Sequence, residues 1–191
     1  VHIYPRLMPT PSLSFAVRDL RSCGGVVITA SHNPAKYNGY KVYGADGCQI
    51  TTEAAAAIQQ EIDRIDPFAD VYTLDFAEGL ASGIIAYIGE DTVERYLAAV
   101  STASLLPESF SRSASIVYTP LNGTGISCVP RCLRAHGFTN ITIPPEQAEP
   151  DGNFPTCPYP NPEIREALSV GLRLAEKTGS ELLLALSLIH I

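Results

Sequence analysis

The sequence predicts an α/β protein made of two consecutive domains with mixed sheets. Short apolar runs with the composition of buried strands, such as residues 25–28 and 116–119, alternate with stretches of helical periodicity. Loops rich in Gly, Asn and Pro follow these runs, and this order of elements is typical of α/β folds. A chain of 191 residues with 46% hydrophobic content is long enough for one large or two small cores.

The first half of the chain contains the elements of the first predicted domain. Residues 1–4 predict a strand, and Pro9-Thr10-Pro11 breaks the chain before a helix capped at Pro11 or Ser12. A second helix is expected from Thr51 or Thr52 through Ile65, and a third from Asp91 or Thr92. Apolar side chains line one face of each helix: Leu13, Val17 and Leu20; Ile58, Ile62 and Ile65; Val93, Leu97 and Val100.

The remaining elements follow from turn residues and apolar runs. A hairpin is expected around Ala45-Asp46-Gly47, and residues 83–88 predict a strand. No element is predicted over residues 66–82. The serine-rich stretch around Pro107 marks the boundary, so we expect one domain over residues 1–106 and another over residues 107–191.

The second domain is expected to begin with the strand at residues 116–119 and a glycine loop from Leu121 to Gly125. Asn-Gly-Thr-Gly matches neither phosphate-binding glycine motif, so tight-turn geometry is the favoured explanation of this loop. A helix follows with Pro130 in its first turn. Strands are predicted at residues 138–143 and 181–185, and between them a helix from Asn161 to Gly179 with Ile164, Leu168, Leu172 and Ala175 on its buried face.

The loop after residues 25–28 carries the residues best suited to chemistry. Ser31 is its evident nucleophile, and His32 titrates near neutral pH. Adjacent side chains on an extended backbone point apart, so this pair is poorly suited to a Ser-His hydrolase. Asn38-Gly39 predicts a chain reversal that can return Lys41 toward the serine. A fixed cation near a serine hydroxyl suits a phosphoryl group better than an acyl group.

The hexapeptide Thr29-Ala30-Ser31-His32-Asn33-Pro34, with Tyr37-Asn38-Gly39-Tyr40-Lys41 after it, resembles the phosphoserine loop of the α-D-phosphohexomutases, the phosphoglucomutase and phosphomannomutase superfamily. The resemblance continues through residues 118–125, 145–147, 150–155 and 160–163, and looks most like the phosphoglucomutase/phosphopentomutase branch. It implies α/β domains of phosphohexomutase type, truncated at both ends, with part of domain 1 and most of domain 2 in this chain.

The resemblance also implies a reaction, namely the interconversion of hexose 1-phosphate and hexose 6-phosphate through a bisphosphorylated sugar. In that mechanism Ser31 carries the phosphate, Lys41 is a general acid/base or a phosphate clamp, and His32 contacts the phosphoryl group. Mg²⁺ and glucose 1,6-bisphosphate, the activator, are the implied cofactors. The Asp-rich metal loop of the family is expected directly after residues 181–185, but residues 186–191 contain no carboxylate. Phosphorylated Ser31 is therefore the one metal ligand expected here, and we expect the chain by itself to be inactive.

Composition restricts the partners. A net charge of −7 and a pI near 5.0 argue against nucleic acid and anionic membranes, and neither a membrane-spanning run nor a signal peptide is evident. We expect a cytoplasmic monomer that acts on a small phosphosugar. The five cysteines lack a complete set of metal ligands at usual spacing and are interpreted as packed or idle thiols.

Other functions remain open at this point. A phosphopentomutase acting on ribose or deoxyribose 1-phosphate is the first alternative. A catalytically inactive module that binds sugar phosphates is the second. An acyl hydrolase that uses Ser31 is disfavoured, because Gly-x-Ser-x-Gly is absent and no third residue orients His32.

Overall fold

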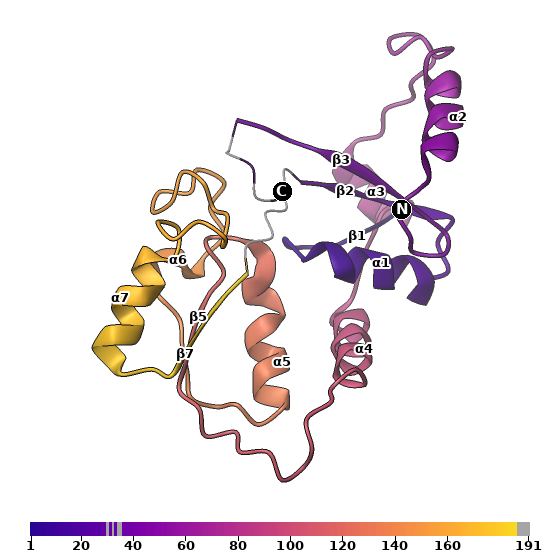
Figure 1. Ribbon diagram of the computed structural model, residues 1–191. Coiled ribbons are helices and arrows are strands. Elements are labelled where there is room, and N and C mark those ends of the chain that lie inside the picture. The colour runs from indigo at the N-terminus through magenta and orange to yellow at the C-terminus, as the bar shows by residue number, and fades with distance from the viewer. Residues whose placement is uncertain (30, 32, 34–35, 187–191) are drawn as a thin grey trace.

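The computed structural model describes residues 1–29, 31, 33 and 36–186, which form two α/β units in contact with each other (Figure 1). The elements of the first unit are β1 (His2–Ile3), α1 (Thr10–Asp19), β2 (Gly24–Ile28), β3 (Tyr40–Gly44), α2 (Thr52–Ile62), α3 (Phe76–Ala81) and β4 (Ala86–Tyr87). Those that follow are α4 (Glu90–Ser101), β5 (Ile116–Thr119), the 3₁₀ turn η1 (Thr124–Ser127), α5 (Val129–Ala135), β6 (Ile141–Thr142), α6 (Pro145–Ala148), α7 (Ser169–Thr178) and β7 (Leu182–Ala185).

The first unit has two short sheets with α1 packed against them. β1 pairs with β4 in parallel, and β2 pairs with β3 in antiparallel register from Gly24 opposite Gly44 to Ile28 opposite Tyr40. The strand predicted at residues 1–4 is reduced to His2–Ile3, and the strand predicted at residues 25–28 is confirmed. The turn at residues 45–47 is confirmed as well, since Gly44 N–H donates to the Cys48 carbonyl across it. α1 begins at Thr10, one or two residues before the expected capping residue, and Val17 on its predicted face is buried.

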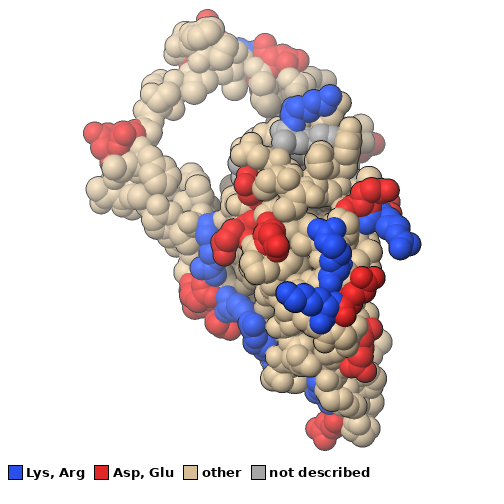
Figure 2. Space-filling model, turned by 90° about the vertical axis from the view of Figure 1, so that its left-hand side faces the viewer, with Lys and Arg blue, Asp and Glu red and all other residues tan. Residues whose placement is uncertain are grey.

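The segment around α2 differs most from the prediction. Its helix ends at Ile62 and not at Ile65, and the predicted apolar face is exposed, with 43%, 52% and 46% of Ile58, Ile62 and Ile65 accessible. Every residue from 51 to 78 is exposed, and the chain arches away from the body here (Figures 1 and 2). The periodicity identified the helix, but no surface in the described part of the chain covers its apolar face.

Two further predictions for the first unit need correction. α3 lies in the stretch where no element was expected, and its start is fixed by Asp75, whose carboxylate accepts hydrogen bonds from Ala77 N–H and Glu78 N–H. The strand predicted at residues 83–88 is reduced to Ala86–Tyr87. Its partner β1 offers only two paired residues, and Gly83 turns the chain with a φ of 75°.

The second unit is a three-stranded parallel sheet in the order β6-β5-β7, with α5 on one side and α7 on the other (Figure 1). The central strand β5 is buried along its whole length, as its apolar sequence predicted. The strands predicted at residues 116–119 and 181–185 and the helix containing Pro130 are confirmed. The strand predicted at residues 138–143 is reduced to Ile141–Thr142.

The last helix begins later than predicted. Residues 161–168 form consecutive turns, in which the Asn161 side chain accepts from Glu163 N–H and Ile164 N–H donates to the Asn161 carbonyl. Only from Ser169 does the chain become α-helical, and Gly179 ends it in the left-handed conformation, as expected. The predicted face is half-buried, and the fully buried residues here are Ala167 and Gly171.

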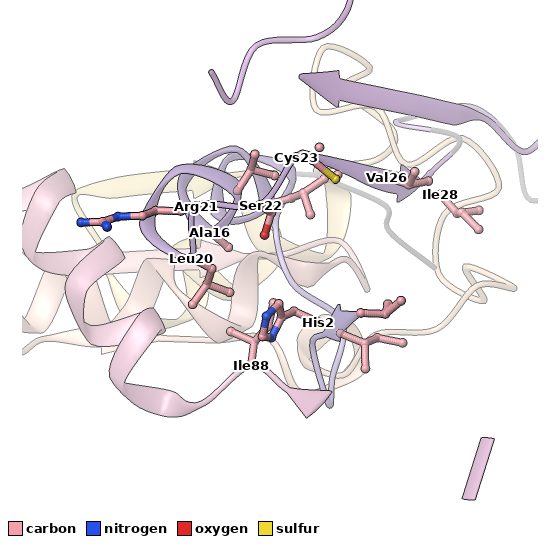
Figure 3. Close-up of a pocket in the computed structure, with 15 residues that line it drawn as sticks. His2, Ala16, Leu20, Arg21, Ser22, Cys23, Val26, Ile28 and Ile88 are labelled. Atoms are coloured by element: carbon pink, nitrogen blue, oxygen red, sulfur yellow. The ribbon is translucent and has the colours of Figure 1, made fainter. Parts of the chain in front are cut away.

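A cavity of about 710 Å³ separates the two sheets of the first unit (Figure 3). Its lining is mostly apolar and includes His2 of β1, Leu20 just after α1, and Val26 and Ile28 of β2. Thr29 N–H donates to the Gly39 carbonyl, which makes these two residues a hydrogen-bonded pair of the β2–β3 ladder. Hydrogen-bonded and non-hydrogen-bonded pairs alternate in an antiparallel ladder, so the backbone N–H and C=O groups of Val26 and Ile28 face away from β3. Within the described residues no strand pairs with this side of β2, so the cavity lies against an unpaired strand edge.

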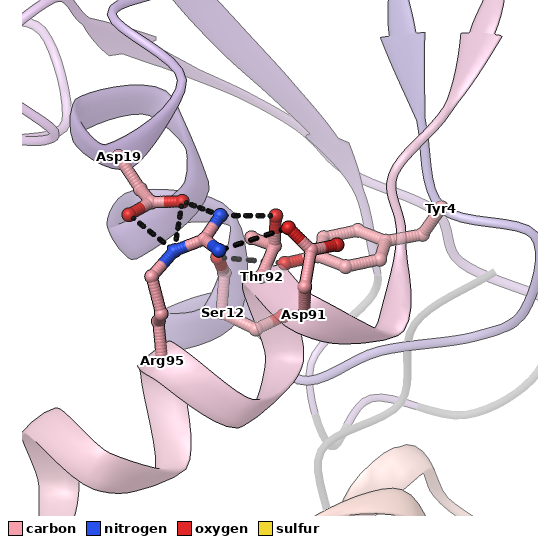
Figure 4. A network of polar contacts seen from close by, with 6 residues as sticks. All are labelled: Tyr4, Ser12, Asp19, Asp91, Thr92 and Arg95. Atoms are coloured by element: carbon pink, nitrogen blue, oxygen red, sulfur yellow. Dashed lines mark hydrogen bonds and ion pairs between the residues drawn. The ribbon is translucent and has the colours of Figure 1, made fainter.

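Helix α4 joins the two units. Met8, Val93, Leu97 and Cys128 form a shared apolar core, and Ser127 Oγ donates to the Leu7 carbonyl. Ion pairs lie above this core, with Glu90 bound by both Arg6 and Arg131, and Glu94 bound by Arg131. Figure 4 shows the contact between α4 and α1, where Arg95 lies between Asp19 and Asp91.

The surface carries charges of both signs. Figure 2 shows Lys and Arg side chains next to Asp and Glu on the face in view, without a continuous basic area. None of the helices in the described ranges is both long enough and apolar enough to cross a membrane.

Candidate functional site

Ser31 lies just beyond the carboxyl end of β2. Thr29, before it, is buried, and its Oγ1 accepts a 2.9 Å hydrogen bond from Ser31 N–H. This side chain-to-backbone turn accompanies a left-handed backbone at Ser31, with a φ of 57°. Non-glycine residues adopt this conformation rarely, and such residues cluster at functional sites. Ser31 is half-buried.

The chain reversal that follows is built around a close approach of two backbones. Asn38 Oδ1 accepts from Gly39 N–H at 2.9 Å, which supports the predicted turn. A Cβ added at Gly39 would clash with the Thr29 carbonyl oxygen, so only glycine lets β3 begin this close to the serine loop. The glycine therefore fixes the position from which β3 returns.

Lys41 lies on β3 opposite Val27. The chain does return beside β2, but the register places Lys41 four residues before Ser31 along that strand. Among the described residues no hydrogen bond or ion pair joins the two side chains. Both side chains are half-buried. Without a contact between them, their action on one phosphoryl group remains a prediction.

The third predicted site residue, His32, lies outside the described residues, as do Ala30, Pro34 and Ala35. Lys36 is a further cation in this loop, beyond the residues singled out from the sequence. Its Nζ lies 5.1 Å from the centre of the Tyr37 ring, which is a cation–π contact within the same loop.

The second predicted loop, from Leu121 to Gly125, is a buried structural turn. Leu121 and Asn122 have φ values of 52° and 56°. Backbone N–H groups that could have faced an anion are used internally: Leu121 N–H donates to Thr119 Oγ1, Asn122 N–H to the Gln147 carbonyl and Gly123 N–H to the Pro120 carbonyl. These bonds agree with the tight-turn interpretation.

A buried polar network holds this turn against α6. Gln147 is completely buried, accepts from Thr119 Oγ1 at 2.7 Å and donates to Thr156 Oγ1 at 3.1 Å. Asn122 Nδ2 donates to the carbonyls of Glu146 and Glu149 at 3.2 and 2.9 Å. A satisfied network of this kind specifies one arrangement of the loop.

The residues described here do not form a metal site on their own. No group of three or more His, Cys, Asp or Glu side chains gathers at one point within the described ranges. The thiols are not arranged for metal binding either, and burial raises the pKa of Cys128 to about 11. A metal thiolate requires deprotonation, which such burial opposes.

Both units of the chain match domains of one known protein family. Residues 1–69 match the family model described as phosphoglucomutase/phosphomannomutase, alpha/beta/alpha domain I, and residues 94–187 match domain II of the same family. The chain belongs to the phosphoglucomutase/phosphomannomutase superfamily. The expected resemblance and α/β fold class are thereby confirmed for both units.

Curated relatives of this superfamily member include mutases for different sugars. A phosphoglucomutase from Staphylococcus saprophyticus is 38% identical over 176 residues, covering 92% of this chain and 32% of the relative. A phosphoribomutase from Saccharomyces cerevisiae is 39% identical over 187 residues, covering 92% of this chain and 30% of the relative. The chain thus spans about a third of the length of these relatives.

Solved structures show the same fold. A structure from Thermus thermophilus, described as a candidate phosphomannomutase, is 27% identical with a TM-score of 0.71. The match covers 91% of this chain and 36% of that protein. Both units and their connection are therefore included in the shared fold.

Proposed function

We propose that the protein containing this chain is an intramolecular phosphotransferase that interconverts hexose 1-phosphate and hexose 6-phosphate. The observation that carries the proposal is the left-handed Ser31, held by Thr29 at the end of β2 inside the segment that matches domain I. A serine phosphate is stable in water but can transfer its phosphoryl group to a bound sugar hydroxyl.

The proposed steps conserve the phosphate groups. The bond between Ser31 Oγ and phosphorus breaks as a sugar hydroxyl oxygen bonds to the same phosphorus, and the proton of that hydroxyl passes to Ser31 Oγ. The resulting sugar bisphosphate turns over within the site. The bond between its other phosphoryl group and the sugar then breaks as that group bonds to Ser31 Oγ, and the serine hydroxyl proton passes to the freed sugar oxygen. Both sugar positions therefore use the same serine.

Lys41 and His32 have supporting roles in this proposal. Lys41 donates or accepts the proton, or pairs with the negative phosphoryl oxygens, and His32 contacts the transferring group. Glucose 1,6-bisphosphate is the proposed activator and Mg²⁺ the proposed ion. The described residues do not complete a magnesium site, so we assign no step to the ion.

The substrate proposed first is glucose 1-phosphate. Ribose or deoxyribose 1-phosphate is the second candidate, because one of the two relatives reported above is named a phosphoribomutase. We further propose a cytoplasmic monomer that acts on small phosphosugars and has neither nucleic acid nor a membrane as its partner.

The test uses protein expressed from the complete reading frame that contains this chain. It is incubated with glucose 1-phosphate, Mg²⁺ and a trace of glucose 1,6-bisphosphate, and a parallel reaction contains ribose 1-phosphate. Formation of glucose 6-phosphate supports the first proposal, and formation of ribose 5-phosphate alone supports the second. Saturable sugar-phosphate binding without conversion would favour an inactive binding module and reject the mutase.

A further inference from the structure

Tyr118 is the one side chain in the described residues whose polar atom is fully buried without a hydrogen-bond partner. The residue is 0% exposed, and no group in the described ranges bonds to its hydroxyl. Leaving a buried hydroxyl unpaired is costly, and such atoms are rare in folded proteins. Burial also raises the pKa of Tyr118, so the phenol stays protonated and can donate.

The hydroxyl lies close to Gly125 and to the point where the chain leaves β7. A Cβ added at Gly125 would clash with Tyr118 Oη, and the same added atom would lie 3.5 Å from the Leu186 carbonyl oxygen. Gly125 does not have a positive φ, so its small size is needed for this close approach and not for its backbone conformation. The hydroxyl and the Leu186 carbonyl thus approach the same point beside Gly125.

Leu186 is the residue where the chain leaves β7. Its N–H continues the ladder by donating to the Thr119 carbonyl at 3.1 Å. Within the described residues its carbonyl oxygen accepts no hydrogen bond. Tyr118 Oη therefore lies near a carbonyl oxygen to which no described residue donates a hydrogen bond.

Thr119, the next residue on β5, shows the satisfied counterpart on the other face of the strand. Its hydroxyl donates to Gln147 Oε1 at 2.7 Å, and both residues are buried. Successive side chains of a strand point to opposite faces. The end of β5 is therefore fixed through Thr119 on one face, and Tyr118 is placed to do the same on the other.

We propose that Tyr118 is a positioning residue whose hydroxyl is joined to the nearby Leu186 carbonyl through one water, and so fixes the chain as it leaves β7. Binding and catalytic groups of parallel α/β sheets come from the segments that follow the carboxyl ends of the strands. A fixed Leu186 would hold the carboxyl ends of β5 and β7 in one arrangement, on the side of the sheet where such groups act. The kinetic part of this proposal rests on the proposed mutase function, and the hydrogen bond itself does not.

Hydrogen exchange of the 191-residue chain tests the hydrogen bond. In Tyr118→Phe we expect the Leu186 amide hydrogen to exchange roughly tenfold faster than in wild type, because the loss of one hydrogen bond changes an opening equilibrium by about that factor. We also expect the melting temperature to fall. The matched control is Tyr159→Phe, since Tyr159 is 59% exposed, and it should change neither quantity. If the hydroxyl is unpaired in solution, Tyr118→Phe will leave the exchange unchanged and keep or raise the melting temperature, which would overturn the proposal.

Two further measurements keep the test decisive. If Tyr118→Phe does not fold, the hydroxyl proton of wild-type protein labelled at tyrosine is observed by NMR, and rapid exchange with water would reject the bond. In protein from the complete reading frame, Tyr118→Phe should lower kcat about tenfold with an unchanged KM. Faster exchange with unchanged kcat would reject the positioning role. A wild-type protein without turnover would count against the proposed function alone.

Discussion

Two nitrogens of Arg95 in α4 donate hydrogen bonds to Asp19 in α1 (Figure 4). Nε donates to both carboxylate oxygens at 3.0 and 3.1 Å, and Nη2 donates to one of them at 2.7 Å. The same guanidinium donates to Asp91 at 2.8 Å and to Thr92 Oγ1 at 3.1 Å within its own helix. Asp19 is only 16% exposed. Arg95 therefore links α1, which packs against β2, to α4, which contacts the second unit.

We predict that Arg95→Met lowers the melting temperature more than Arg64→Met does. Arg95 joins helices far apart in the sequence with a bidentate geometry, whereas Arg64 pairs with Glu61 on one exposed helical end, with both side chains 70% exposed. Thermal unfolding followed by circular dichroism gives both values. Equal shifts for the two variants would show that the Arg95 contact contributes no more than an ordinary surface pair.

The Asp19 contact should also shape stability in acid. Hydrogen bonds from Arg95 hold the pKa of Asp19 below its ordinary value of 3.8, so the folded state binds this proton more weakly than the unfolded state. Its contribution is present above the unfolded pKa and is lost as pH falls through the lower folded pKa. The stability difference between wild type and Arg95→Met should thus shrink below about pH 4. Urea unfolding at pH 7, 4 and 3 measures it, and a constant difference would contradict the assignment.

Ser31→Ala should abolish mutase turnover of the complete protein without disturbing the fold. Thr29 Oγ1 binds the backbone N–H of residue 31, which alanine retains, and both residues pay a similar cost for the left-handed conformation. Intact-mass analysis should show one phosphate on active wild type, mapped to Ser31, and none on the variant. Ser104→Ala, at an exposed serine, is the control. A phosphate mapped to another residue would refute the role of Ser31.

Lys41→Met should reduce kcat/KM of the complete protein by roughly two to four orders of magnitude, the usual range for loss of a general acid/base group. The melting temperature should change little, because Lys41 makes no ion pair among the described residues. Lys177→Met, at an exposed position in the last turn of α7, is the control. A loss below about tenfold would make Lys41 an ordinary strand residue.

Cys128 should resist alkylation in the folded chain. Burial raises its pKa to about 11, and it belongs to the core shared by α4 and the second unit. Iodoacetamide at pH 8 should therefore label the exposed Cys23 and Cys48 and spare Cys128 until the chain unfolds. Peptide mass spectrometry after short labelling times identifies the modified thiols. Labelling of Cys128 at the rate of Cys23 would show that the shared core opens readily.

Local sequence patterns correctly predicted the elements whose conformation depends on a few neighbouring residues. The run at residues 116–119 became the central strand, and Gly179 ended α7, because burial on both faces and a left-handed cap each require particular residue types. The same logic failed at residues 161–168, where the spacing of Ile164 and Leu168 imitates a helix. There the Asn161 hydrogen bonds and the prolines nearby favour turns instead.

Part of the candidate site could be predicted from local sequence patterns, and part depends on contacts between distant residues. Ser31 and Lys41 stood out because a strand-loop-strand motif surrounds them, and the antiparallel pairing of β2 and β3 followed from Asn38-Gly39. Gln147 and Tyr118 could not be found from the sequence, since their importance depends on contacts with residues distant along the chain. The register that places Lys41 opposite Val27 is likewise a property of the pairing and not of either strand alone.

The hydrogen bond from Ser127 to Leu7 joins residues 120 positions apart, and Met8 shares its core with Cys128 just beyond. During synthesis at about 5 to 20 residues per second, the N-terminal part of this contact waits roughly 6 to 24 s for its partner to be made. For that interval Met8 lacks the Cys128 side of its core. Codon usage that slows translation between α1 and α5 would lengthen this interval and should lower the yield of folded protein, while every contact in the finished molecule stays the same.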